Sequence, residues 1–371
     1  MKPGDVIGGY RVVTEPTNAD GGKCVWAFAE KNGKEYFLKR FLEPKRPREG
    51  SAGSAASRRI RLETCREFEE RHRSIMKLLR PDASGAGNLV LATDFFHAGS
   101  TYYKVTERID TASLEDPQAL GSKQKAVLLR TLATSLRLLH DIDVVHGDLK
   151  TANVLVQKRE AAAFHTAKLI DFDDSYLSGR PPAREEIAGD SLYGAPEWRR
   201  YVRGDESVQA RDLTTAVDVF ALGLMTHLYL TGSLPAYTGR YGSPADAANA
   251  AEPLVADDRL GTSTQALIAA MTAADPKARP TVAAFLEALK DAELCTLHST
   301  PQPPPGASDP GKEHAGSATS DGPRRSRVQF NPPDRSGHRP PAATDDGPKK
   351  SRVRINLGRH RDDLPGSRSA P

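Results

Sequence analysis

Two short motifs in the middle of the chain constrain its fold more than any other feature. The first is HGDLKTANVLV at residues 146–156, and the second is LIDFD at residues 169–173. Each lies on a short apolar run, at residues 154–156 and 168–170, of the kind that predicts a β-strand. We expect the two strands to form a rigid hairpin that fixes the polar side chains beside them.

The polar residues of these motifs are the types that phosphoryl transfer needs. Transfer from ATP requires a carboxylate that orients the acceptor hydroxyl, oxygen ligands for Mg²⁺ and a cation near the transferring phosphate. Asp148 is the candidate base and Lys150 the candidate cation. Asn153 and Asp171 are the candidate ligands of Mg²⁺, or of Mn²⁺ as an alternative, because such ions also take phosphate and water oxygens. A lone Asp or Asn in a loop is usually a turn residue, but this ordered set favours catalysis.

The two motifs resemble the catalytic loop and the metal loop of the protein-kinase family, in particular the eukaryotic-like Ser/Thr kinases of bacteria. The resemblance covers roughly residues 10–289. It implies an α+β, bilobal protein-kinase fold. Residues 1–109 would form a small lobe with a five-stranded antiparallel sheet and one helix, and residues 110–294 a mainly helical large lobe. Residues 295–371 are rich in Pro and Arg and would form a disordered tail.

Local patterns agree with this division of the chain. Strands are predicted at residues 10–14, 24–29, 35–41, 89–96 and 102–106, and helices at residues 62–79, 126–139, 214–230 and 282–293. Asn32 and Gly33 suit a two-residue hairpin turn, Gly232 would end the third helix, and Thr281 would cap the last one. Residues 43–57 are rich in Pro, Gly and Ser, and we expect them to form a mobile connection.

The resemblance assigns a nucleotide site to the small lobe. Lys39 stands where the family has the lysine that binds the α- and β-phosphates of ATP and pairs with a helix glutamate. Glu69 is the expected partner of that lysine, and Glu70 is the alternative. Gly21 and Gly22 would let backbone amides approach phosphate, whereas an ordinary hairpin turn is the alternative.

Further positions follow from the same resemblance. Thr106 would limit the back of the adenine pocket, and it is followed by Glu107 in a segment that resembles the hinge. In the large lobe, Glu197 and Arg279 would form a buried ion pair. The presence of both partners is informative because a single buried charge is costly. Asp218 would hold the backbone of the catalytic loop.

The two adjacent glycines depart from the family pattern, which has three glycines in a six-residue frame, and the chain departs from it at three further places. Gly147 replaces an arginine that many kinases neutralise with a phosphorylated activation loop, so we expect no need for that phosphorylation. Asp173 replaces a glycine, which restricts the backbone and adds a carboxylate near the metals. Asp190 and Ser191 occupy the segment where a threonine commonly lines the acceptor site, which leaves the preference between Ser and Thr open.

Charge and cysteine content exclude other classes of protein. The formal net charge is +4, of which residues 295–371 contribute +5, from 13 Lys and Arg against 8 Asp and Glu. Residues 1–294 are therefore close to neutral. No apolar run approaches the length of a membrane span and no signal peptide follows Met1, so we expect a cytoplasmic protein with no membrane partner. The 3 widely spaced cysteines disfavour disulfides and zinc.

The tail contains an internal repeat, in which DGPRRSRVQFN at residues 321–331 recurs as DGPKKSRVRIN at residues 346–356. It is either a short linear motif used twice or a chance duplication in a charged tail. As a motif, it would be phosphorylated by the protein itself at Ser326 and Ser351, or would dock a partner such as a phosphatase. The tail has few aromatic residues and many Asp residues, which disfavours nucleic-acid binding.

Together these features predict an ATP-dependent Ser/Thr protein kinase that signals by phosphorylating protein substrates and itself. A small-molecule phosphotransferase resembling aminoglycoside and choline kinases is the alternative. That class would lack YGAPEW at residues 193–198, the helix at residues 218–223 and Arg279. A pseudokinase scaffold is a further alternative, but it usually loses one of the catalytic or metal-binding residues, all of which are retained here.

Overall fold

The computed structural model describes residues 1–19, 22–48, 54–79, 86–109, 114–158 and 164–298. The chain divides into a compact unit, Met1–Pro303, and a second unit, Pro304–Pro371, which lies wholly outside the described residues. The predicted disordered tail begins too early, because Cys295 is buried and Leu297 pairs with Leu260 of the large lobe. The rest of that tail, its repeat and the phosphorylation sites Ser326 and Ser351 stay predictions. The same holds for Gly21, which also lies outside the described residues.

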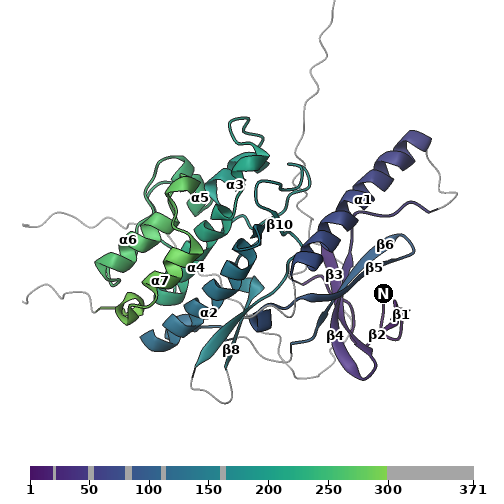
Figure 1. Cartoon of the computed structure of the whole chain (residues 1–371), viewed down its shortest axis with the longest axis horizontal. Coiled ribbons are helices and arrows are strands. Elements are labelled where there is room, and N and C mark those ends of the chain that lie inside the picture. The colour runs from purple at the N-terminus through teal and green to yellow at the C-terminus, as the bar shows by residue number, and fades with distance from the viewer. Residues whose placement is uncertain (20–21, 49–53, 80–85, 110–113, 159–163, 299–371) are drawn as a thin grey trace, which may run out of the picture. The chain divides into compact units, whose positions relative to one another are not determined.

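The small lobe is an antiparallel sheet in the order β1-β2-β3-β4-β6-β5 (Figure 1). Its strands are β1 Val6–Ile7, β2 Tyr10–Val12, β3 Cys24–Lys31, β4 Lys34–Phe41, β5 Ala92–Ala98 and β6 Thr101–Glu107. The sheet has six strands, so the prediction of five was wrong. The additional strand β1 has 2 residues, too few for an alternating pattern to be recognised.

The turn between β3 and β4 confirms the hairpin prediction. Asn32 and Gly33 both have positive φ angles, 53° and 73°, and they connect the paired residues Lys31 and Lys34. Two positive φ angles match the right-handed twist of the adjoining strands, and Asn and Gly adopt them at low cost. This hairpin sets the register that places Lys39 on β4.

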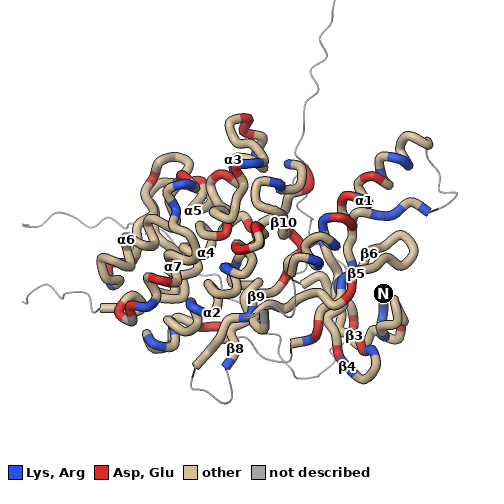
Figure 2. Tube along the Cα trace, viewed as in Figure 1, with Lys and Arg blue, Asp and Glu red and all other residues tan. Residues whose placement is uncertain are grey.

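Helix α1, Ala55–Leu78, begins earlier than the predicted residue 62. Ser54 caps it by accepting a hydrogen bond from the backbone N–H of Ser57, so the last residues of the expected mobile connection are helical. The first two turns carry no apolar face, which is why periodicity did not detect them. Basic and acidic residues lie along the helix (Figure 2). Cys65, Phe68 and Ile75 are buried.

The large lobe is mainly helical. Its helices are α2 Ser122–His140, α3 Pro196–Val202, α4 Ala216–Thr231, α5 Pro244–Asn249, α6 Thr262–Met271 and α7 Val282–Ala288. Its strands are β7 Val144–Val145, β8 Val154–Lys158, β9 His165–Leu169 and β10 Tyr176–Leu177. Short 3₁₀ turns lie at Ala86–Asn88, Pro117–Ala119, Thr151–Asn153, Ala210–Asp212, Pro276–Ala278 and Ala292–Cys295.

Two predicted helix ends can be compared with the structure. Gly232 ends α4 in the left-handed conformation, with φ of 87°, as expected. Helix α7 begins after the cap Thr281, also as expected, but it ends at Ala288 rather than near residue 293. The chain instead starts a new 3₁₀ turn, which Asp291 caps by accepting a hydrogen bond from the backbone of Glu293.

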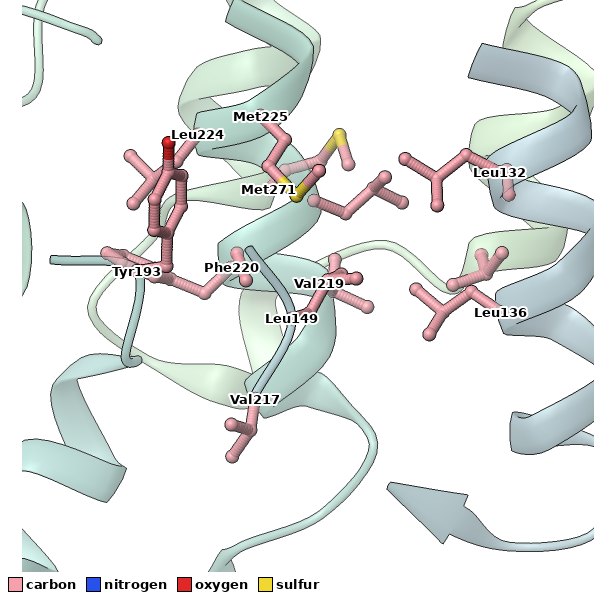
Figure 3. Packing of buried hydrophobic residues seen from close by; sticks show 14 of the residues in the cluster. Leu132, Leu136, Leu149, Tyr193, Val217, Val219, Phe220, Leu224, Met225 and Met271 are labelled. Carbon is pink, nitrogen blue, oxygen red and sulfur yellow. The ribbon is translucent and has the colours of Figure 1, made fainter. Parts of the chain in front are cut away.

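Helices α2 and α4 form the centre of the large-lobe core. Leu132 and Leu136 on α2 are fully buried, as are Phe220 and Met225 on α4 (Figure 3). Each such side chain contributes about 1.5–3 kcal/mol when it is fully buried. Because α4 is buried on nearly every side, this packing fixes the position of its first turn, which contacts the catalytic loop.

The predicted catalytic hairpin is present. Strands β8 and β9 pair antiparallel, with Val154 opposite Leu169, and the backbone N–H of Ile170 donates to the carbonyl of Asn153 at 3.0 Å. The two motifs of the sequence are therefore adjacent in space.

In the described part of the chain no helix is both long and apolar enough to cross a membrane. The three cysteines are buried free thiols.

Candidate active site

Asp218, in the first turn of α4, holds the backbone of the catalytic loop in place. Its fully buried carboxylate accepts hydrogen bonds from the backbone N–H of His146 at 2.7 Å and of Gly147 at 3.0 Å. The His140 ring nitrogen Nε2 lies 3.0 Å from the same carboxylate. The predicted contact between Asp218 and the loop backbone is thus confirmed.

Gly147, in the catalytic loop, packs closely against the segment that follows the metal loop. Its φ angle is +81°, and a Cβ atom built on it would lie 2.6 Å from the carbonyl oxygen of Asp174. A non-glycine residue here would be strained in its backbone and would also collide with that carbonyl. The close approach of the two segments therefore requires glycine at this position.

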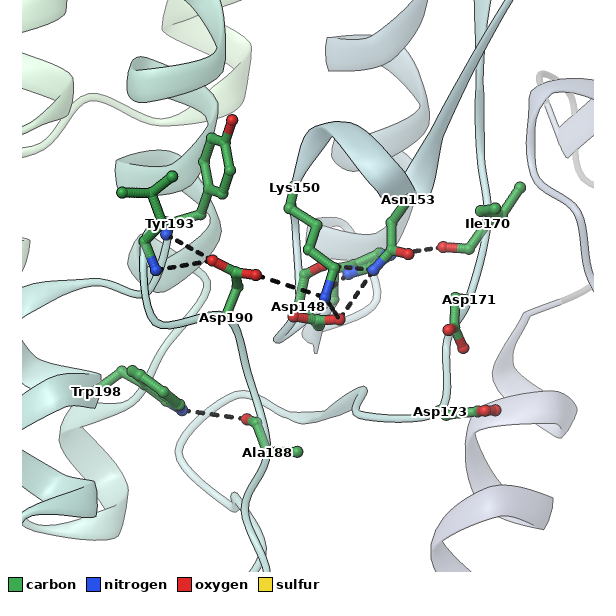
Figure 4. A network of polar contacts seen from close by, with 12 residues as sticks. Asp148, Lys150, Asn153, Ile170, Asp171, Asp173, Ala188, Asp190, Tyr193 and Trp198 are labelled. Atoms are coloured by element: carbon green, nitrogen blue, oxygen red, sulfur yellow. Dashed lines mark hydrogen bonds and ion pairs between the residues drawn. The ribbon is translucent and has the colours of Figure 1, made fainter. Parts of the chain in front are cut away.

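Asp148 is oriented by two neighbours on the same loop (Figure 4). Its Oδ2 lies 2.8 Å from the Lys150 ammonium and accepts a hydrogen bond from the Asn153 side-chain amide at 2.9 Å. That amide also donates to the Asp148 carbonyl at 2.8 Å. The second carboxylate oxygen, Oδ1, is buried and has no hydrogen-bond partner among the described residues.

Lys150 lies between two carboxylates. Its ammonium is 2.8 Å from Asp148 and 3.6 Å from Asp190, whose other oxygen accepts from the backbone N–H of Leu192 and Tyr193 (Figure 4). Burial favours the neutral amine, but the hydrogen bond to Asp148 and the negative charges of Asp148, Asp190 and Asp171 together outweigh it and raise the pKa of Lys150. The cation expected near the transferring phosphate is thus charged and close to the base.

Asp171 faces the small lobe. Both of its oxygens accept from the Lys39 ammonium at 2.8 Å. Its φ angle is 64°, a left-handed conformation that Asp adopts more readily than most residues. Burial, together with the charge of the neighbouring Asp173, raises the pKa of Asp171. Burial beside other carboxylates also raises the pKa of Asp174, to about 7.

The predicted helix partner of Lys39 was wrong. Glu69 accepts hydrogen bonds from Arg46 and from the Tyr102 hydroxyl, both at 2.6 Å. Glu70 is exposed, 3.9 Å from Arg66. Residues of an α-helix are rotated by about 100° from one to the next, so the burial of Phe68 and His72 turns the two acids away from Lys39.

Lys39 instead contacts Asp173, a carboxylate that was expected near the metals. Oδ2 of Asp173 accepts from Lys39 at 2.7 Å, and Oδ1 accepts from Lys104 of β6 at 2.7 Å. Lys104 and His72 were not among the predicted site residues. A signal existed, because a lysine interrupts the otherwise apolar and aromatic centre of the strand TYYKVTE.

The remaining candidate nucleotide-site residues lie on β6 and in the turn before β3. Thr106 and Glu107 form the end of β6, opposite Phe37 and Tyr36 of β4. Gly22 is exposed, with a φ angle of 52° and open space around its Cα. Contacts of these residues with a nucleotide stay predictions.

The oxygen donors of the site suit a hard divalent cation. The Asn153 amide nitrogen is used by Asp148, so the amide oxygen is its free ligand, and Asp171 supplies a carboxylate. No cluster of three or more His, Cys, Asp or Glu residues that could enclose a metal occurs within the described ranges. Two protein oxygens suit Mg²⁺, which retains water and phosphate ligands.

The predicted ion pair between Glu197 and Arg279 is present. The guanidinium donates to both carboxylate oxygens, at 2.7 and 2.8 Å, and the exposed fractions of the Arg279 and Glu197 side chains are 0% and 5%. Arg279 also donates to the carbonyls of Ala216, Ala273 and Ala274. The pair therefore joins α3 to the start of α4 and to the segment before α7.

These contacts define the class of the protein as a two-lobed phosphotransferase, because Lys39 of the sheet lobe meets the metal loop of the helical lobe. A model of the protein kinase domain matches residues 22–290, which is more than half of the chain. The chain belongs to the protein kinase family. Members of this family transfer the γ-phosphoryl group of ATP to protein hydroxyl groups.

Several characterised relatives are similar to parts of this chain. Serine/threonine-protein kinase RAD53 of Saccharomyces cerevisiae is 26% identical over 155 residues, covering 40% of this chain and 18% of the yeast protein. Serine/threonine-protein kinase pkn2 of Myxococcus xanthus is 30% identical over 150 residues, which cover 40% of this chain and 17% of the Myxococcus protein. Protein kinase kin1 of Schizosaccharomyces pombe is 28% identical over 241 residues, which cover 62% of this chain and 25% of the fission-yeast protein. The chain spans a quarter or less of the length of these three relatives.

Proposed function

We propose that this chain is an ATP-dependent Ser/Thr protein kinase that uses Mg²⁺. The observation that carries the proposal is the asymmetry of the Asp148 carboxylate. Lys150 and Asn153 hold one oxygen, whereas the other is buried and has no partner in the part of the chain that the structure describes. A carboxylate held in this way can accept a hydrogen bond from a substrate hydroxyl and orient it for attack.

The other side chains support this role. Lys39 is the cation for the α- and β-phosphates, and Lys150 is the cation for the transferring group. Asn153 and Asp171 are the metal ligands; bound Mg²⁺ would neutralise charge on the phosphate oxygens. Thr106 and Glu107 are the hinge residues beside the adenine, and Gly22 belongs to the loop over the phosphates.

Two observations favour a protein substrate over a small molecule. The pair between Glu197 and Arg279 and the contact between Asp218 and the catalytic loop belong to the large-lobe features expected of protein kinases. Relatives named as serine/threonine-protein kinases favour Ser and Thr as the acceptors.

Gly147 has no side chain that a phosphorylated activation segment could neutralise, which supports activity without that phosphorylation. A cytoplasmic location and a partner for the tail repeat stay predictions.

The test is transfer of label from γ-labelled ATP in the presence of Mg²⁺, to the chain itself and to generic protein substrates. Asp148→Asn keeps the shape of the side chain but removes its charge, and we expect it to lower transfer by at least about 100-fold. Asp141→Asn is the matched control, because Asp141 is an exposed aspartate at the end of α2. We expect that variant to retain wild-type activity.

Mapping the label by mass spectrometry identifies the acceptor. Label on Ser or Thr that depends on Asp148 would support the proposal, and label at Ser326 or Ser351 would make the tail repeat a product of the reaction. Transfer to an aminoglycoside or choline but not to protein would contradict it. Binding of ATP without transfer to any acceptor would favour a pseudokinase.

A further inference from the structure

Lys39 and Lys104 are direct neighbours across two strands of the sheet. They are opposite each other in the antiparallel pair of β4 and β6, so both side chains leave the same face. Both are largely shielded from water, with side-chain exposed fractions of 13% for Lys39 and 7% for Lys104. Two like charges at such a pair of positions repel, and burial makes an unpaired ammonium costly. The two lysines therefore need an anion between them.

Asp173 is that anion. One carboxylate oxygen accepts from Lys39 and the other from Lys104, each at 2.7 Å. The Asp173 side chain is 12% exposed, so both hydrogen bonds are shielded from water. One oxygen binds Lys39 of β4 and the other binds Lys104 of β6, so the carboxylate is held at both oxygens. It therefore fixes the position of the Lys39 ammonium.

Helix α1 offers no acid in this region. The residue that it presents to the two lysines is His72, whose Nδ1 lies 3.4 Å from the Lys104 ammonium. His72 is 2% exposed and is packed between the rings of Phe68 and Phe95. The acid next to this face, Glu69, is used by Arg46 and Tyr102.

Asp171 also contacts Lys39, but it has a second task. It is the candidate metal ligand, and its side chain is more exposed than that of Asp173, at 32%. A carboxylate that ligates a cation has less negative charge to share with a lysine. Asp173 contacts Lys39 and Lys104 and points away from Asn153 (Figure 4), so its hydrogen bond to Lys39 does not compete with metal ligation.

We propose that Asp173 is the positioning residue of this kinase, holding the Lys39 ammonium where the phosphates of ATP bind. It performs the task for which a glutamate on α1 was expected, and Lys104 holds Asp173 for that task. The inference rests on the proposed function and deepens it by naming the residue that prepares the nucleotide site.

The test compares Asp173→Asn with Glu69→Gln, each of which removes one carboxylate and keeps the size of the side chain. For Asp173→Asn we expect the Kd and the KM for ATP with Mg²⁺ to rise about tenfold or more, and kcat to fall, since a charged hydrogen bond to Lys39 is lost. For Glu69→Gln we expect changes of about twofold or less. Lys104→Met should weaken ATP binding in the same direction as Asp173→Asn.

Calorimetric binding of ATP separates this inference from the proposed function. A wild-type chain that binds ATP but transfers nothing would overturn the proposed function, and the ratio of Kd values would still test Asp173. An Asp173→Asn protein that melts as wild type does and binds ATP equally well would overturn the inference, and so would equal weakening by Glu69→Gln. Should Asp173→Asn not fold, Lys104→Met decides: weaker ATP binding supports the inference, and unchanged binding overturns it.

Discussion

Gly147 shows how closely the backbone segments of the active site approach one another. The residue has a left-handed backbone, and the carbonyl of Asp174 occupies the space that a side chain would need. On the other side of the peptide, its N–H donates to Asp218. A small change at Gly147 should therefore alter both the catalytic loop and the segment after the metal loop.

We expect Gly147→Ala to destabilise the protein by about 2–4 kcal/mol, from backbone strain plus the collision with Asp174. Gly204→Ala is the matched control, because Gly204 has a φ angle of +82° but no atom within 4 Å of the added Cβ. That variant should lower the free energy of unfolding by about 1 kcal/mol, from backbone strain alone. Urea unfolding of both variants measures the difference, and equal losses would show that the collision does not matter.

The residues whose roles depend on local spacing could be predicted. Asp148, Lys150 and Asn153 lie on one short loop, so their order along the chain already brings them together. The partner of Lys39 could not be predicted in this way. It depends on which face of α1 packs against the sheet, and that face is set by the burial of Phe68 and His72.

At the scale of elements, α1 is distinguished by a buried histidine in its inward face. The rings of Phe41, Phe68 and Phe95 surround His72, and Lys104 lies beside it. Burial, and then the charge of Lys104, lower the pKa of His72 well below its usual value of 6.5. The folded protein therefore holds this ring neutral.

The pH dependence of stability should reveal this histidine. The unfolded chain binds a proton at His72 near pH 6.5 and the folded chain does not, so the stabilisation present above that pH is lost as the pH falls. At pH 5 the loss from this residue is at most about 2 kcal/mol. We expect His72→Gln to reduce the loss of unfolding free energy between pH 7 and 5, as measured by urea denaturation.

His97→Gln is the control for that measurement, since His97 is an exposed histidine on β5. It should leave the pH dependence of the wild type unchanged. A wild-type slope that persists in His72→Gln would contradict a neutral, buried His72. Direct titration of the ring by NMR provides an independent check.

The existence of the main elements was predictable, whereas several of their ends were not. Strands β3, β4 and β6 and helices α2 and α4 carry patterns long enough to be recognised. The two-residue strand β1 and the polar first turns of α1 carry none, and the end of α7 depends on the cap that Asp291 makes. Capping and edge pairing depend on neighbouring chain segments rather than on periodicity.

At the scale of the whole compact unit, one ion pair connects parts of the large lobe that are distant in sequence. Glu197 and Arg279 are 82 residues apart, and the guanidinium lies over the Phe220 ring at 5.1 Å. A buried pair of this kind is not by itself a large source of stability, but the loss of one partner leaves a charge buried without compensation.

Glu197→Ala should therefore lower the free energy of unfolding by about 3–5 kcal/mol. Glu287→Ala, which breaks the exposed pair with Lys290 at the end of α7, should change it by about 0.5 kcal/mol or less. Chemical denaturation of the two variants under the same conditions makes the comparison. Similar effects of the two substitutions would contradict a structural role for the buried pair.

The class of the protein, the catalytic loop, the metal loop and the pairing of Glu197 with Arg279 could be read from the sequence. The two loops are recognisable because their chemistry depends on residues a few positions apart, and the pair because both residues stand where the resemblance to protein kinases implies them. The contact of Asp173 with Lys39, by contrast, required the folded structure. That contact depends on the register of β4 with β6 and on the rotation of α1, both of which are set by packing over the whole small lobe.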